Sequence, residues 1–138
     1  MKYDAVQQSL EAFVKTNWTA TAIQYDNVAF NSDIYTEYLQ CTIVFGEGFA
    51  RTVTKGCYRQ VGLLILSAKT RPGIGSARKL ELAKLAAEMV LSVVVQPVPP
   101  LVAPAVNLRT PDLFNDNKER DGWVMAQVSC PFYYDLEY

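Results

Sequence analysis

Hydrophobic residues first recur at helical spacing near the N-terminus. Val6, Leu10, Phe13 and Val14 fall on one side of a helix, and Asp4 can cap its start. The spacing predicts a short amphipathic helix.

A second and stronger helical pattern follows Ser76, which can cap the start of that helix. Its apolar stripe consists of Leu82, Leu85, Ala86, Met89, Val90 and Val93. A stripe of this width is typical of a helix that packs on a core, so we expect the main helix here.

Between these helices the pattern changes to the period of a strand. A short extended piece is expected within Trp18–Phe30, and Thr36–Phe45 alternates apolar and polar side chains. Gly46-Glu47-Gly48 is expected to break this strand, and Cys57–Ala68 resumes as the next one. The two long strands predict an antiparallel hairpin. Because Leu63–Leu66 is continuously apolar, we expect both faces of the second strand to be covered.

The last third of the chain begins with a proline-rich segment, Gln96–Ala105, which cannot be helical and is expected to be extended. Asn107–Asp121 is polar and acidic and is predicted to be a loop. Gly122–Tyr134 alternates and predicts a final strand. Pro131 lacks an N–H donor, so this strand is expected at a sheet edge or with a bulge.

Together these elements predict one domain over residues 1–138 with an α/β (α+β) fold. A mixed, mainly antiparallel β-sheet with a long hairpin would pack against two amphipathic helices. At 138 residues the chain can bury a core without disulfides or a metal.

Charge is distributed unevenly along the chain. The net charge of −1 argues against a dedicated nucleic-acid-binding protein. No acidic residue lies between Glu47 and Glu81, whereas the regions on either side are acidic. A basic middle and acidic ends could pair copies head to tail, although the charges could instead mix on folding and leave no patch. The candidate interface residues are Arg51 and Lys55 at the hairpin tip, with Arg59, Arg71, Arg78, Asp112, Asp116, Glu119 and Asp121.

Candidate catalytic chemistry is sparse. The chain has no histidine, so it lacks a Ser-His or Cys-His pair. Cys41, Cys57 and Cys130 are widely spaced and form no zinc motif, and the first and last are expected in the core. We therefore expect no catalytic site, no cofactor and no metal, and a protein that is not an enzyme.

The cellular setting is inferred from the ends and the apolar runs. The N-terminus is polar and lacks the apolar stretch of a signal peptide. The longest apolar run, Met89–Val95, is too short to span a bilayer. We expect a cytoplasmic protein, without membrane contact, in a reducing compartment.

One segment is compatible with a different function, the binding of a nucleotide. Gly73–Arg78 follows a strand and opens a helix, where a phosphate-binding glycine loop would lie. Arg78 stands where the third glycine of that motif belongs, and proline-rich chain follows the helix instead of another strand with an acidic end. A tight turn explains both glycines, and a nucleotide-binding module stays as an alternative.

The element order resembles the tail terminator and terminator-like proteins of long-tailed bacteriophages. The likeness runs over nearly the whole chain and rests mainly on Ala22–Phe30 (AIQYDNVAF), Arg59–Leu66 (RQVGLLIL), Pro72–Arg78 (PGIGSAR) and Asp121–Val128 (DGWVMAQV). The proline-rich Gln96–Ala105 departs from the family's pattern.

This resemblance implies a non-catalytic virion protein at the neck-proximal end of the tail. It would form a homo-hexameric ring that caps the tail tube, ends polymerisation of the major tube protein and presents a surface to the head-tail connector. Asn107–Asp121 and the hairpin tip Ala50–Gly56 would be the contact elements. The alternatives are a neighbouring neck or tail-completion protein, the nucleotide-binding module, and an adaptor that binds a peptide along the edge strand near Pro131.

Overall fold

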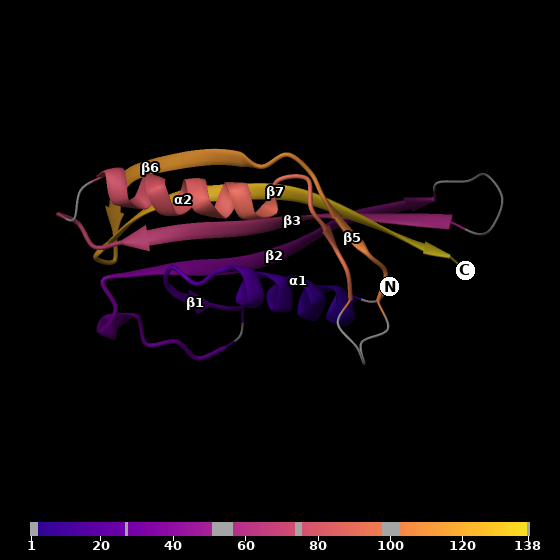
Figure 1. Cartoon of the computed structure of the whole chain (residues 1–138), viewed down its shortest axis with the longest axis horizontal. Coiled ribbons are helices and arrows are strands. Elements are labelled where there is room, and N and C mark those ends of the chain that lie inside the picture. Colours follow the sequence, from indigo (N-terminus) through magenta and orange to yellow (C-terminus); the bar gives the residue numbers. More distant parts are fainter. Residues whose placement is uncertain (1–2, 27, 51–56, 74–75, 98–102, 138) are drawn as a thin grey trace.

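The structure is built on one long sheet with both helices on the same face (Figure 1). The computed structural model describes residues 3–26, 28–50, 57–73, 76–97 and 103–137, and the hairpin-tip candidates Arg51 and Lys55 lie outside them. The elements are α1 Tyr3–Asn17, β1 Ala22–Gln24, a 3-10 turn Ser32–Ile34, β2 Glu37–Ala50, β3 Cys57–Thr70, α2 Ser76–Val90, β4 Val94–Val95, β5 Val106–Leu108, β6 Asp112–Arg120 and β7 Trp123–Glu137.

Strand pairing gives a mixed, mostly antiparallel sheet. Within the described residues seven strands pair in the order β1-β2-β3-β7-β5-β4, with β6 also on β7. Of the strand pairs in the described ranges, only β1 with β2 is parallel. The predicted α+β class, with a long hairpin and two helices, is confirmed.

The helices pack through the predicted stripes. Val6, Leu10 and Val14 of α1 are fully buried, as is Leu82 of α2. Leu85 is 47% exposed, so its predicted place in the stripe is wrong. No helix in the described ranges is both long enough and apolar enough to cross a bilayer.

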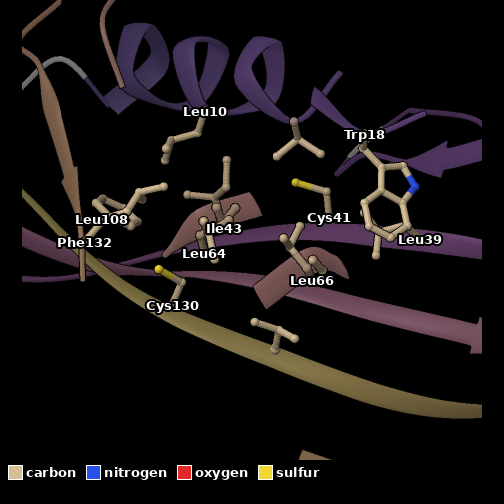
Figure 2. Packing of buried hydrophobic residues seen from close by; sticks show 14 of the residues in the cluster. Leu10, Trp18, Leu39, Cys41, Ile43, Leu64, Leu66, Leu108, Cys130 and Phe132 are labelled. Atoms are coloured by element: carbon tan, nitrogen blue, oxygen red, sulfur yellow. The ribbon is translucent and has the colours of Figure 1, made fainter. Parts of the chain in front are cut away.

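The core lies between these helices and one face of the sheet. Figure 2 shows Leu10 of α1 above side chains that rise from β2, β3 and β7. The buried strand residues are Leu39, Cys41, Ile43, Leu64, Leu66, Ala68, Ala126, Val128, Cys130, Phe132 and Tyr134. Every second residue of each long strand faces the helices, as the alternation predicts.

The predicted break in the first long strand does not occur. β2 runs through Gly46 and Gly48 to Ala50, with a bulge between Phe45 and Gly48. The buried Gln60 stabilises the bulge, because its side-chain amide donates hydrogen bonds to the carbonyls of Gly46 and Val61. The outer ends of β2, β3 and β7 project beyond both helices (Figure 1).

Covering of β3 on both faces was also a wrong expectation. Leu64 and Leu66 are fully buried under the helices, but Leu63 is 38% exposed. Alternate residues of the continuous apolar run therefore point into the core, and the others point to the side of the sheet that no helix covers. We call this uncovered side of the sheet the open face.

The predicted polar loop Asn107–Asp121 is mostly strand. β5 and β6 share one edge of β7, and Arg120 pairs with Trp123 across a two-residue turn. The turn residues, Asp121 and Gly122, have φ values of +53° and +81°. An Asp-Gly pair with both φ positive is typical of a tight hairpin turn, and it positions the acidic segment beside β7.

Pro131 does not lie at an edge, because β7 is flanked by β3 on one side and by β5 and β6 on the other. Its carbonyl accepts a hydrogen bond from the Arg109 N–H at 2.8 Å. In an antiparallel strand the N and O of one residue point the same way. The missing N–H therefore faces the junction between β5 and β6 and leaves the ladder to β3 intact.

The proline-rich Gln96–Ala105 joins β4 to β5, whose residues Val95 and Val106 pair with each other. Residues 98–102 of this segment are outside the described ranges.

Candidate interaction surfaces

A groove of about 620 Å³ lies on the open face, and we call it the open-face groove. Its floor and walls are formed by Gln24, Ser32, Asp33, Tyr38, Gln40, Thr42, Ile65, Ser67, Lys69, Lys118, Arg120, Asp121, Trp123, Met125 and Gln127. The lining combines amide and hydroxyl side chains with charged side chains of both signs. This mixture suits hydrogen bonding to another protein surface.

Lys69 is one of three cations that line this groove, with Lys118 and Arg120. Its ammonium lies 5.8 Å from the centre of the Tyr38 ring. Burial lowers the pKa of Lys69, and the charge of Asp121 opposes that effect. Sequence reasoning did not select Lys69, because its position in the groove depends on strand register.

An apolar row crosses the open face beyond the groove. Val44 pairs with Leu63, and Leu63 pairs with Pro131 on its other side, so the three lie side by side across β2, β3 and β7. Val44 is 45% exposed and Leu63 is 38% exposed. We call these three residues the open-face row.

A second hollow of about 490 Å³ surrounds Tyr133 near the ends of β4 and β5. We call it the Tyr133 depression. It is lined by Arg59, Ser92, Val93, Val94, Asn107, Leu108, Arg109, Thr110 and Tyr133.

Two of the predicted basic interface residues are paired inside the molecule. Arg59 forms two hydrogen bonds with the Asp135 carboxylate, at 2.8 and 3.0 Å. Arg78 donates two hydrogen bonds to the Glu37 carboxylate, from Nε at 2.8 Å and from Nη2 at 2.7 Å. These hydrogen bonds from Arg78 lower the pKa of Glu37. The basic middle thus meets both acidic regions within one chain.

Arg71 is held by another kind of contact. Its guanidinium carbon lies 3.8 Å from the centre of the Trp123 ring, which is 7% exposed. Its nitrogens donate to the carbonyls of Gly122 and Ser32, both at 3.4 Å. Arg71 therefore links the 3-10 turn to the β6–β7 turn.

The predicted acidic interface residues lie on β6 and the turn after it. Asp112, Glu119 and Asp121 are exposed. Asp116 is 9% exposed, accepts a hydrogen bond from the Lys118 N–H at 3.0 Å and lies 3.4 Å from an Arg120 nitrogen. Three of the four carboxylates are thus available to a partner.

The edge strand β6 exposes apolar residues as well as charge. Leu113 is 48% exposed and Phe114 is 59% exposed, and neighbouring residues of a strand point to opposite faces. The outer edge of β6 has no strand partner in the part of the chain that the structure describes. An edge of this kind is a template for pairing with another chain. The predicted peptide-binding edge near Pro131 is replaced by this one.

Two of the three cysteines, Cys41 and Cys130, are poor nucleophiles. Burial raises the pKa of Cys41 to about 12 and that of Cys130 to about 11. Both lie in the core, as predicted, and all three cysteines are free. Within the described ranges, no group of three His, Cys, Asp or Glu side chains could hold a metal.

The glycine-loop hypothesis rests partly on residues 74 and 75, which lie outside the described ranges. Gly73 has a φ of +92°, so the turn into α2 requires a glycine there, with or without a ligand. Nucleotide binding stays an untested alternative.

Comparison with known proteins identifies a fold only. No family model and no curated protein match the chain. Eighteen solved chains match it in structure. One of them has a TM-score of 0.64 at 19% sequence identity, with 98% of this chain and 93% of that chain covered. Its name gives no function, and identity this low indicates a shared fold alone.

Proposed function

We propose that this protein is a structural virion subunit that forms a ring on the tail tube of a long-tailed bacteriophage. The ring ends polymerisation of the tube protein and offers its other side to the head-tail connector. Assembly takes place in the host cytoplasm. This role involves no catalysis.

The observation that carries the proposal is the open face. One side of the sheet packs against both helices, and the other exposes the open-face row and the polar open-face groove. A contiguous apolar row with a polar surround is typical of a surface that binds protein. A subunit that acts only by assembly needs such a surface.

A ring also requires two unlike patches, because one patch of each copy must contact a different patch of the next. The open face and the edge of β6 differ in chemistry and in position. The outer edge of β6 offers backbone hydrogen-bonding groups, whereas the open face offers side chains alone, including that of Phe114, which pairs with the groove residue Gln127. This asymmetry favours a ring in which each copy contacts the next head to tail, and it disfavours pairing of two identical patches.

The test compares two substitutions that add one negative charge to a partly exposed leucine. Leu63→Glu lies in the open-face row, and Leu85→Glu lies on the outer side of α2. Both variants are first checked for a native circular dichroism spectrum. Negative-stain images are then recorded with and without purified tube protein.

We expect six-fold rings or capped tubes for the unsubstituted chain and for Leu85→Glu, and their loss in Leu63→Glu. Rings in Leu63→Glu as abundant as in the unsubstituted chain would contradict the role of the open face. Uniform monomers that also ignore tubes would contradict the proposal itself. Monomers that bind the head-side connector instead would identify the neighbouring neck protein.

A further inference from the structure

The Tyr133 depression is rich in positive charge and hydrogen-bond donors. Its lining supplies two guanidinium groups, the side-chain amide of Asn107, and hydroxyls from Ser92, Thr110 and Tyr133. Among the residues that the structure describes, no carboxylate belongs to the lining. Donors of hydrogen bonds and positive charge therefore converge on a hollow without a lining anion.

Arg59 forms the rigid side of this hollow. Its guanidinium carbon lies 4.1 Å from the centre of the Tyr133 ring, and its two hydrogen bonds to Asp135 fix its plane. Stacking on an aromatic ring while binding a carboxylate edge is a favourable geometry for arginine. Asp135 compensates the charge of Arg59 from outside the lining.

Arg109 forms the other side and is not compensated. Its guanidinium carbon lies 5.9 Å from the same ring, and its side chain has no ion pair or hydrogen bond among the described residues. Its backbone is fixed, because the N–H donates to the Pro131 carbonyl at 2.8 Å and the carbonyl lies 3.1 Å from the Cys130 sulfur. A rigid backbone thus presents five unused N–H donors beside a second cation.

We propose that the Tyr133 depression binds a carboxylate side chain from an acidic segment of a partner protein. Arg109 receives the carboxylate with its planar fork, as Arg59 already receives Asp135, and Asn107 and Thr110 supply further donors. The match of a guanidinium fork to a planar carboxylate favours this ligand. A chain of net charge −1 disfavours a polyphosphate backbone as the partner. This inference does not depend on the tail-tube role.

The experiment uses the full chain and an acetylated, amidated peptide with an Asp-Glu-Asp core as the probe. Amide NMR spectra follow the titration, with inorganic phosphate as a second probe. The variants are Arg109→Gln, Arg109→Lys and Lys84→Gln. Lys84 is a matched control because its side chain is 76% exposed on α2 and its removal changes the net charge equally.

We expect saturable shifts at residues 107–110 and 133 with the peptide. Affinity falls about tenfold in Arg109→Gln, from the loss of a charge-assisted hydrogen-bonded pair. Arg109→Lys also weakens binding, because lysine keeps the charge but lacks the fork, and Lys84→Gln stays within about twofold. Equal weakening in Arg109→Gln and Lys84→Gln, phosphate binding as tight as the peptide, or an absence of saturable shifts would each overturn the proposal.

Discussion

A glycine in the middle of the central strand provides the sharpest test of the packing. Gly62 of β3 pairs with Phe45 on one side and with Phe132 on the other. The rings of Phe45 and Phe132 meet edge to face, with centroids 6.0 Å apart. Glycine inside a strand usually costs stability, and here the Phe132 ring fills the space left by the absent side chain.

Replacing Gly62 with alanine forces an atom into that space. Its methyl group would lie 2.6 Å from the Val44 carbonyl oxygen and 2.8 Å from a carbon of the Phe132 ring. The ring can rotate, but the carbonyl belongs to the neighbouring strand, so β2 must shift. Overpacking of this kind costs about 2–3 kcal/mol of the free energy of unfolding. For a domain of this size that loss lowers Tm by roughly 10 °C.

Gly46→Ala is the matched control, because a methyl there meets only ordinary contacts, 3.4 Å from Val61 atoms. Urea unfolding followed by circular dichroism measures both variants, and we expect Gly46→Ala within about 0.5 kcal/mol of the unsubstituted chain. Shortening Phe132 to leucine should return part of the stability lost in Gly62→Ala, because the two sites share one space. A neutral Gly62→Ala, or additive effects in the double variant, would refute the packing argument.

Two further predictions concern titratable groups. Arg78→Gln should lower the free energy of unfolding by about 1 kcal/mol at pH 7. Because Arg78 lowers the folded-state pKa of Glu37, this loss should persist at any pH above the ordinary glutamate pKa and shrink as the pH falls below it. A loss in urea titrations that is as large at pH 3 as at pH 7 would contradict the pairing. At pH 8 a thiol reagent should label Cys57 in the native chain and leave Cys41 and Cys130 unreacted, because burial raises the pKa of both thiols. In denaturant it should label all three cysteines. Rapid labelling of a second thiol in the native chain would contradict the core packing.

Local patterns were sufficient to predict the helices and the three long strands. Burial of Val6, Leu10 and Val14 follows from their spacing alone, since the face of a helix is set by residues three or four apart. The hairpin between Thr36–Phe45 and Cys57–Ala68 was predicted from alternation and a polar connection.

The errors arose where tertiary pairing outweighs local polarity. Asn107–Asp121 reads as a loop because its side chains are polar, yet an edge strand needs only backbone partners and benefits from charge. The Asp121-Gly122 pair was the signal that could have corrected this prediction. Gly46 and Gly48 predict a break in the strand because the sequence does not show that Gln60 binds across the bulge.

Strand register also decides which charges a partner can reach. The linear charge pattern singled out Arg59 and Arg78, but folding places each against a carboxylate from an acidic end of the chain. Lys69, which belongs to the basic middle but was not a candidate interface residue, and Arg109, which lies outside that region, line hollows on the surface, where neither has an ion pair among the described residues. The charge of an arginine that already binds a carboxylate is partly neutralised, so it gains less from a second carboxylate than a cation that has no ion pair. Recognition by this protein is therefore expected to depend more on Lys69 and Arg109 than on Arg59 and Arg78.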